Sequence, residues 1–482
     1  MLDTVSTGSD SDLVNDGSQK SSGISHANTD QVAIAPYTDC VQEQMSSRRD
    51  FLRLATATAA FGPFFLFPHR TLPRQKTLKI AKWSHFLREY DTWFEEVLAK
   101  EWGQQHDTRV IVDHIPIEKI NGRAATEIAN GKGHDLFMFP WPPAQYKQHV
   151  IDHTEIYQAV SFQHGNVDRL GHKSTFDLTT RRYFAFADFW MPAPLHYFQD
   201  YWSEVNIPLG PLHYDGLRSG GKRLRAKLGI PCGLALAPSL ESNITLHTLL
   251  YAFNSSVLDA EGNVVINKNA RTVVALKYVK ALYEDAGTPD QLTWGSSGNV
   301  RAMLARKTSC TINAISLLRA AEDENPEAAK KIRIQPPLLG SAGVMAVPHV
   351  TNCSAVWNFA ENKDGARQFL VDLIDNSKAV YEKSRGCNFP IYQKTLPDLI
   401  VRLENDPHGD PPYKYKELKD ALHWTPNLGF PGYANPVAME VFNTFVIPRM
   451  FMAVVKGKLT PEDAARAAES EVQHIFDKWK QT

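Results

Sequence analysis

Aromatic residues next to small polar residues are the side chains in this sequence with the most distinctive binding chemistry. The segment Trp83-Ser84-His85 is one example, and Trp141 lies in an aromatic and proline-rich run that begins at Phe139. Trp190 is a third candidate. A flat ring packs against the C–H face of a sugar, while nearby polar side chains hydrogen-bond to its hydroxyl groups. These residues are candidates for binding a hydroxylated ring, and an ordinary buried aromatic residue is the alternative for each.

Signatures of the common hydrolases and cofactor enzymes are absent from the sequence. It contains no G-x-S-x-G, no H-E-x-x-H, no C-x-x-C-H and no dinucleotide fingerprint, and its cysteines lack the spacing of a zinc site. Residues 216–223 approximate a P-loop, but Arg223 replaces the Ser or Thr that binds Mg²⁺, and no hydrophobic strand precedes the segment. We therefore expect neither a metal nor a cofactor.

The elements that position these residues follow from hydrophobic periodicity. Strand patterns cover residues 78–83, 109–114 and 135–139, and helical patterns cover about 90–102 and 117–129. Strand, helix, strand, helix, strand is the pattern of a parallel sheet covered by helices. Ligands bind at the carboxyl ends of such strands, which here carry Trp83-Ser84-His85, His114 and Phe139-Pro140-Trp141.

Length and charge narrow the class of protein. A chain of 482 residues can bury a large core and usually forms more than one globular lobe. The formal net charge is −1, and no dense Lys/Arg stripe alternates with aromatic residues. Nucleic acid is therefore not expected as a partner.

The N-terminal part of the chain predicts export. Residues 1–44 are polar and poor in large apolar side chains, which predicts a disordered or mis-annotated leader, with Met45 as the true initiator. Residues 45–76 resemble a twin-arginine signal, in which Arg48-Arg49-Asp50-Phe51-Leu52 precedes an apolar run of about 14 residues, shorter than a membrane span of about 20. A buried helix after two arginines is the alternative. No cysteine follows the run, which argues against a lipid anchor.

Four cysteines, Cys232, Cys310, Cys353 and Cys387, lie beyond this region and far apart in the sequence. Export makes one or two disulfides possible, but buried free thiols are the favoured interpretation, because the twin-arginine route moves proteins that have already folded in the cytoplasm.

Six segments, taken in order, resemble the family 1 extracellular solute-binding proteins of the maltose and oligosaccharide type. The first is the strand and helix order of residues 78–139, which resembles that family's first lobe. Thr460 in the last segment also suits a helix N-cap with Pro461 at the first helical position. The later segments are Trp190–Trp202, Asp259–Gly287, Arg301–Asn313, Asp364–Leu370 with Gly386–Pro390, and Gly457–Ala465.

The resemblance implies a two-lobed α/β fold, periplasmic-binding-protein-like and of type II. Each lobe would be a mainly parallel sheet flanked by helices, with the ligand cleft between the lobes. The first lobe would hold residues 77–193 plus about 338–425, and the second residues 194–337 plus about 426–482. The chain would cross between them near 191–195 and again near 337–344.

The implied function is that of the substrate-binding receptor of an ABC importer, which closes on a sugar or related polyol and catalyses no reaction. Its partners would be membrane permease subunits and the twin-arginine export machinery, and it would be a periplasmic monomer. Family positions add Ser84 and His85 as ligand contacts in the first lobe. In the second lobe they add Glu241, Ser242 and Asn243 from one loop, and Asn313 and Ser341 from the other cleft loops.

Two departures from the family pattern favour a small ligand. The loop after Asn313 reads Ala-Ile-Ser where sugar binders often have Gly and Trp, and the segment 339–343 is shorter than the usual Gly-rich run. A monosaccharide, a polyol or a phosphorylated polyol would suit a cleft with fewer aromatic platforms.

Two other classes stay open. An exported carbohydrate-active enzyme could use a carboxylate pair such as Asp188 with Glu241, because such pairs meet only in the fold. An exported redox enzyme is suggested only by the twin-arginine signal, since the sequence has no cofactor motif.

Overall fold

The computed structural model describes residues 76–481, and the predicted leader and nearly all of the predicted signal lie outside this range. A six-stranded sheet organises the first lobe, in the order β13-β6-β12-β3-β1-β2. β1 pairs parallel with β2 and β3, whereas β12 pairs antiparallel with β3 and β6. The bounds are β1 (Lys76–Trp83), β2 (Thr108–Ile115), β3 (Leu136–Phe139), β6 (Phe186–Met191), β12 (Val350–Val356) and β13 (Phe389–Pro390).

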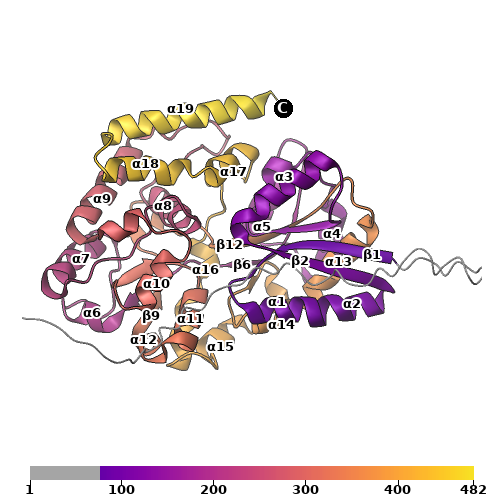
Figure 1. Cartoon of the computed structure of the whole chain (residues 1–482), viewed down its shortest axis with the longest axis horizontal. Helices are drawn as coiled ribbons and strands as arrows, with labels where there is room; N and C mark the ends of the chain where they lie inside the picture. The colour runs from indigo at the N-terminus through magenta and orange to yellow at the C-terminus, as the bar shows by residue number, and fades with distance from the viewer. Residues whose placement is uncertain (1–75, 482) are drawn as a thin grey trace, which may run out of the picture. The chain divides into compact units, whose positions relative to one another are not determined.

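The three strands predicted from periodicity are therefore confirmed. β3, β6 and β12 are buried along their whole length, as expected for strands with both faces covered. Helices supply this cover, and the predicted helix near 90–102 is one continuous helical run made of α1, η1 and α2 (Figure 1). α3 ends at Gly131 in the left-handed region, φ 59°, the conformation that glycine adopts without strain.

The helical elements of the first lobe have the following bounds: α1 (Arg88–Trp93), η1 (Phe94–Ala99), α2 (Lys100–Gln105), η2 (Ile117–Lys119), α3 (Ile120–Asn130), η3 (Ala144–Tyr146), α4 (Thr154–His164), α5 (Arg169–Thr175), α13 (Lys363–Asp375), α14 (Ser377–Lys383) and η5 (Gln393–Thr395). A short hairpin, β4 (Phe176–Asp177) with β5 (Arg182–Tyr183), follows α5.

The second lobe contains a three-stranded sheet in the order β8-β7-β9, made of β7 (Leu195–Phe198), β8 (Cys310–Ile312) and β9 (Ile332–Gln335). β7 pairs antiparallel with both neighbours, so this sheet differs from the mainly parallel one expected for each lobe. The reason is topological. β7 follows β6 after three residues and enters the middle of the sheet directly, while β8 and β9 arrive through helices and run parallel to each other.

Helices surround this second sheet. They are α6 (Gln199–Ser203), α7 (Tyr214–Leu228), α8 (Leu240–Ala252), α9 (Ala270–Ala286), η4 (Pro289–Leu292), α10 (Gly298–Leu304), α11 (Ser316–Glu324) and α12 (Pro326–Lys331). α7 packs on α9, and α8 is buried along its whole length. α8 is therefore the central helix of the second lobe.

Residues 192–194 join β6 of the first sheet to β7 of the second, and residues 345–349, which follow the segment predicted for the second crossing, lead back to β12 of the first sheet. Before the second crossing, the hairpin β10 (Leu339–Gly340) with β11 (Gly343–Val344) packs on the C-terminal end of α8, where Ala342 N donates to Ala252 O at 3.0 Å. At the crossing, His349 N donates to Met191 O at 2.9 Å, so the two connecting segments lie side by side. The exact lobe bounds stay a prediction.

The last part of the chain, from residue 399 on, packs mainly on the second lobe. It contains α15 (Leu399–Glu404), η6 (Pro412–Leu418), α16 (Ala421–Trp424), α17 (Pro436–Asn443), α18 (Val446–Val455) and α19 (Pro461–Lys480). α18 packs on α8, α9 and α19, and Figure 1 shows α18 and α19 side by side. Thr460 caps α19 by accepting from Asp463 N at 3.1 Å, which confirms the predicted cap.

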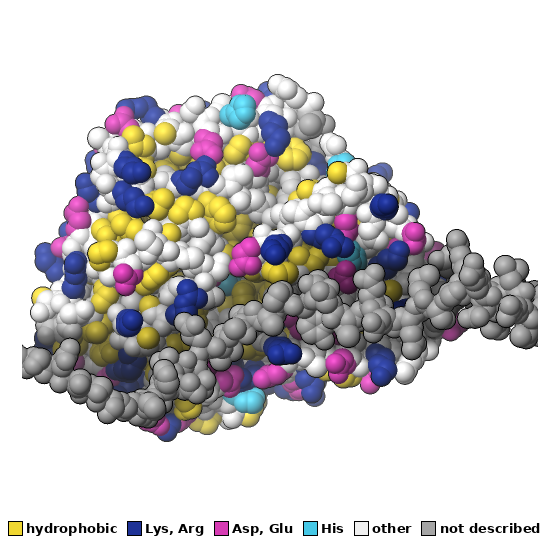
Figure 2. All heavy atoms as spheres, viewed as in Figure 1, with side chains coloured by type: hydrophobic (Ala, Val, Ile, Leu, Met, Phe, Trp, Pro, Cys, Tyr) yellow, Lys and Arg dark blue, Asp and Glu magenta, His cyan; other side chains and the backbone are white. Residues whose placement is uncertain are grey.

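The four cysteines of the described residues, Cys232, Cys310, Cys353 and Cys387, are buried with free thiols, which agrees with the favoured interpretation. On the face drawn in Figure 2, positive and negative side chains are interspersed, in keeping with the near-zero net charge. Within residues 76–481 no single helix is long and apolar enough to span a membrane. Only when α17 and α18 are taken together, with a bend of 46° between them, do length and apolar composition reach those of a membrane span.

Candidate functional site

The loop after β1 packs mainly against the first lobe itself. Trp83 is fully buried and its Nε1 donates to Asn352 Oδ1 at 2.7 Å. His85 is also buried, with Nε2 3.1 Å from Asn388 Oδ1 and Nδ1 accepting from Leu87 N at 3.0 Å. Burial, followed by the nearby Lys82 charge, lowers the His85 pKa to about 4. Both side chains therefore have partners within their own lobe.

The neighbouring residues of this loop are less buried. Ser84 is half-buried, and its N–H donates to Ile115 O at 2.8 Å. Phe86 is 37% exposed, and its ring centroid lies 5.3 Å from that of His349 at the second crossing. Phe86, which sequence reasoning did not select, is thus the aromatic ring of this loop that reaches the junction of the lobes.

Of the aromatic residues at the ends of β3 and β6, two are buried in the first lobe and one contacts the second lobe. Phe139 is fully buried and stacks on Phe137, and Trp190 is buried with its ring 5.5 Å from Phe389, so both belong to the first lobe's core. Trp141 differs. Its ring lies 5.5 Å from Phe442 on α17 of the second lobe, and its buried Nε1 has no hydrogen-bond partner among the described residues.

The start of α8 supplies polar groups from the second lobe. Ser242 completes a capping box with Ser239, so its role there is to begin the helix. Asn243 donates from Nδ2 to the backbone oxygen of Phe442 at 2.6 Å. This bond holds the amide beside Phe442, the residue whose ring contacts Trp141. Its buried Oδ1 has no partner within the described part of the chain.

Glu241 faces the first lobe from the same turn of α8. Its Oε1 accepts from Ser297 N at 3.1 Å, while Oε2 is buried and has no partner in the region that the structure covers. Burial raises the pKa of Glu241, and the negative charge of Glu118 from the first lobe raises it further. Glu241 therefore lies between the lobes with one oxygen free to accept a hydrogen bond.

Asn313 and Ser341 lie elsewhere in the second lobe. Asn313, directly after β8, is buried and bonded to its neighbours, with Oδ1 accepting from Ala314 N at 2.8 Å. Ser341 lies in the β10–β11 turn, with Oγ 3.5 Å from Ala252 O at the C-terminal end of α8. The start and end of this helix are about 18 Å apart along its axis. Ser341 is thus not brought together with Glu241 and Asn243.

His349 is a further group at the junction that sequence reasoning missed. It precedes Thr351, whose N–H donates to Pro140 O at 3.0 Å next to Trp141. Both of its ring nitrogens are buried without a partner among residues 76–481, and burial lowers its pKa to about 3. A histidine before a strand is a weak sequence signal. Phe442 lies within an apolar helix and gives no signal.

We use the name seam for six residues of the two lobes that lie along their junction: Phe86, Trp141, Glu241, Asn243, His349 and Phe442. The lobes also touch beside it, where Asn121 Nδ2 donates to Asn443 Oδ1 at 3.1 Å. The seam offers aromatic faces, two free acceptor oxygens and one free indole donor. This set can bind a molecule that carries both hydroxyl groups and an apolar face.

The carboxylate pair suggested for an enzyme and a group of metal ligands are both missing from the described region. Asp188 is held by Asn352 Nδ2 at 2.7 Å inside the first lobe, and burial raises its pKa to about 7. Glu241 has different neighbours in the second lobe, so the suggested carboxylate pair does not form in this arrangement. No group of three His, Cys, Asp or Glu side chains within residues 76–481 could hold a metal ion.

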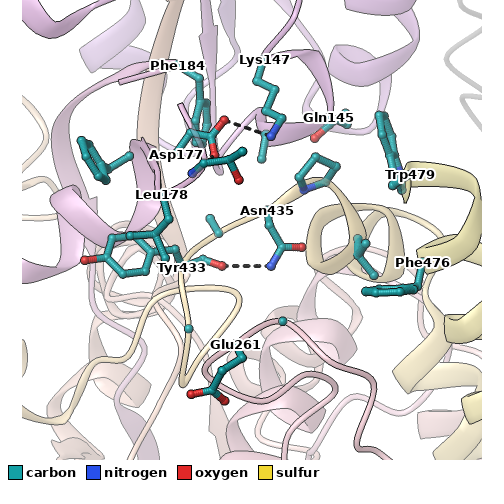
Figure 3. Close-up of a pocket in the computed structure, with 18 of the residues that line it drawn as sticks. Gln145, Lys147, Asp177, Leu178, Phe184, Glu261, Tyr433, Asn435, Phe476 and Trp479 are labelled. Carbon is teal, nitrogen blue, oxygen red and sulfur yellow. Dashed lines mark hydrogen bonds and ion pairs between the residues drawn. The ribbon is translucent and has the colours of Figure 1, made fainter. Parts of the chain in front are cut away.

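An open cavity with a volume of about 420 Å³ lies elsewhere (Figure 3). It is lined by the β4–β5 hairpin, η3 and the loop 259–262, together with the segment 432–437 and the end of α19, and none of the seam residues borders it. We assign the seam as the candidate site because buried polar atoms from both lobes lack partners there, and buried polar groups in proteins are normally hydrogen-bonded.

Comparison with known proteins identifies the fold. No family model and no curated protein matches the chain. Among solved structures, a sugar transporter from Arthrobacter chlorophenolicus A6 with bound laminaribiose has a TM-score of 0.69 at 13% identity, over 83% of this chain and 99% of that one. Maltose-bound MalE3 from T. maritima gives 0.68 at 18% identity with the same coverage.

An ABC transporter solute-binding protein from Agrobacterium radiobacter K84 in complex with ribitol has a TM-score of 0.64 at 17% identity, again over 83% of this chain and 99% of that one. At such low identities the likeness establishes the fold alone. The expected two-lobed, periplasmic-binding-protein-like α/β fold is confirmed.

Proposed function

We propose that this chain is the substrate-binding receptor of an ABC importer and captures a sugar or related polyol by hinged closure of its two lobes. The observation that carries the proposal is the seam. Trp141 Nε1 from one lobe and Glu241 Oε2 and Asn243 Oδ1 from the other are buried without partners in the described chain. Hydroxyl groups of a ligand held at the junction of the lobes would supply partners for these atoms.

The energetics favour such a ligand. A buried polar atom without a partner costs about 1–3 kcal/mol, so the closed seam is unfavourable when empty and favourable when hydroxyl groups fill it. A ligand that touches both lobes binds the closed arrangement better than an open one and shifts the population toward it. The two adjacent crossing segments are the natural hinge, because they are short and hydrogen-bonded to each other.

The solved structures support the same ligand class. Those proteins carry laminaribiose, maltose and ribitol, which are two disaccharides and one polyol. Each presents several hydroxyl groups and an apolar C–H surface, the chemistry that the seam can accept. The alternative of a carboxylate-pair enzyme lacks this support, because Asp188 and Glu241 have separate neighbours.

The route and partners belong to the same proposal. Arg48-Arg49 and the apolar run after them support export by the twin-arginine machinery into the periplasm. There the closed receptor would work as a monomer that is recognised by membrane permease subunits. Closure provides the signal, since it changes the surface that both lobes present together.

A ligand screen tests the proposal. The chain from about residue 77 is melted in the presence of sugars, polyols, polyol phosphates and amino acids, and one compound should raise the midpoint saturably without being consumed. Trp141→Ala should remove most of that shift. The matched control is Phe162→Ala, because this residue is 92% exposed on α4 and should behave like the parent chain.

Two results would contradict the proposal. Degradation of a polysaccharide or aryl glycoside would make the protein an enzyme. A saturable ligand whose effect survives Trp141→Ala unchanged would place binding outside the seam.

A further inference from the structure

The groove in Figure 3 has the size of a small-molecule site and is separate from the seam. Its volume of about 420 Å³ lies in the range of about 300–1,000 Å³ that ligand pockets occupy. The first lobe lines it with Gln145, Lys147 and the hairpin residues 176–179, and the second lobe with the loop 259–262 and the end of α19 (Figure 3). A molecule in the groove would touch both lobes.

Aromatic rings make up much of the lining. Phe176 and Tyr433 lie 6.3 Å apart by ring centroids, and Phe476 and Trp479 line the groove from α19. Two of these rings have their polar atoms engaged elsewhere, because Trp479 Nε1 donates to Glu440 Oε2 at 2.6 Å and the Tyr433 hydroxyl lies 3.4 Å from His172 Nε2. They offer the groove apolar ring surface.

The charges of the groove nearly balance, with Lys147 and Lys480 against Asp177, Asp259 and Glu261, which favours a neutral occupant. Lys147 Nζ pairs with Asp177 Oδ2 at 3.0 Å, and Asp259 is occupied by backbone and side-chain donors of its own loop, including Asn263 Nδ2 at 2.9 Å. Gln145 Oε1 is a buried acceptor without a partner among the described residues. A hydroxyl group would satisfy this oxygen without adding a charge.

We propose that this groove is a second binding site that takes one neutral hydroxylated ring, such as a monosaccharide or a cyclic polyol. Apolar C–H faces pack on the aromatic rings, and hydroxyl groups donate to Gln145 Oε1 and to the polar atoms along the rim.

Occupancy of the groove is coupled to the seam, a step that rests on the proposed function. The lobe arrangement that forms the groove is the one in which Trp141 contacts Phe442 and Asn121 binds Asn443. A molecule that bridges the groove stabilises this arrangement, so it tightens binding at the seam. Linkage requires the reciprocal effect, with a factor of about 5 or more when the coupling is typical.

Binding at the groove is tested first with the seam weakened. Saturation-transfer NMR on the chain from about residue 77 carrying Glu241→Gln, which removes a seam acceptor and keeps the Trp141–Phe442 contact, uses myo-inositol, D-glucose and ribitol as separate probes. One of the two cyclic probes should give a saturable signal, and ribitol, which is acyclic, should give a weaker one. Adding Tyr433→Leu should weaken the signal at least about tenfold, while Phe162→Ala leaves it unchanged.

A second variant guards against a folding defect. Leu178→Trp fills the groove from a side chain that is 54% exposed at the hairpin, so it should block binding while the melting midpoint stays the same. The proposal is overturned if neither myo-inositol nor D-glucose binds. It is also overturned if Tyr433→Leu and Leu178→Trp both leave the binding unchanged. A signal lost in both variants supports it.

Coupling is tested next with the seam intact. A saturating groove probe should lower the Kd of the seam ligand several-fold, and Leu178→Trp should abolish this effect. If no compound binds the seam but the groove signal persists, the proposed receptor function fails and the second site stands. If the seam binds its ligand while the groove variants bind the probes like the parent chain, the second site fails and the receptor function stands.

Discussion

Replacing Glu241 with Gln should have opposite effects on ligand binding and on the stability of the unliganded protein. The variant keeps the side chain's size and an oxygen that can accept from Ser297 N, which is 3.1 Å from Oε1 in the parent structure. It replaces the free acceptor Oε2 with an NH₂ donor and removes the charge. The change therefore tests one atom of the seam.

The size of the binding effect follows from the bond that is lost. A hydrogen bond to a charged acceptor contributes about 1.5–3 kcal/mol. Since about 1.4 kcal/mol corresponds to a factor of ten, Glu241→Gln should weaken binding of a hydroxylated ligand about 10- to 150-fold. Isothermal titration with the compound found in the ligand screen measures this ratio.

The stability effect has the opposite sign. Burial raises the pKa of Glu241 above its usual 4.5, so the folded state holds this proton more tightly than the unfolded state. The stability from the group is present below about pH 4.5 and is lost as the pH rises through the raised pKa. The uncharged variant avoids this loss. Its unliganded melting midpoint should exceed that of the parent at pH 8 and approach it at pH 4.

The control and the refuting result are both specific. Glu204→Gln removes an exposed carboxylate that pairs with Lys227 at the surface, and it should change neither quantity. The reasoning fails if Glu241→Gln lowers the unliganded midpoint at pH 8, because the carboxylate would then be satisfied in the empty seam. It also fails if the variant binds ligand as tightly as the parent.

Three further predictions concern other groups. Burial lowers the pKa of His196 and of His349 to about 3, so the stability that their neutral forms provide is complete above about pH 6.5 and is lost as the pH falls toward 3. His349→Asn should reduce the pH dependence of the free energy of unfolding in this window by up to about 1.4 kcal/mol per pH unit, measured by urea unfolding, and an unchanged slope would contradict the reasoning. Arg319 Nη2 lies 2.6 Å from Oδ2 of the buried Asp406. Arg319→Ala removes this partner and should lower the free energy of unfolding, measured in urea, by about 3–5 kcal/mol, whereas a loss below about 1 kcal/mol would mean that the pair is dispensable. Glu118→Gln removes the negative charge that acts on Glu241 of the other lobe, so ligand binding should become tighter. The gain should be at most about fivefold, because Glu118 is exposed and its charge is screened by solvent; weaker binding would show that the charge assists closure.

Local elements could be predicted from the sequence because their signals lie within a few residues. The first three strands and the two helices between them followed from apolar spacing, and all five are present with bounds that differ by a few residues. The start of α19 at Thr460-Pro461 followed from cap chemistry, which needs only the neighbouring N–H groups. The mainly parallel sheet expected for the second lobe is instead antiparallel in its pairing, because strand pairing depends on how distant segments meet.

The candidate site shows the same division. The sequence by itself determined that Trp83, Trp141 and Trp190 follow or lie in sheet strands. The loop expected at Glu241 and Asn243 is instead the first turn of helix α8, because Ser239 caps that helix. Only the tertiary structure decided that Trp83 and Trp190 pack inside the first lobe, whereas Trp141 reaches Phe442 across the seam. Phe442 and His349 lie at that junction because helix α17 and the second crossing bring them there from far along the chain. Contacts between distant segments depend on how whole lobes pack, and no local pattern of residue types contains that information.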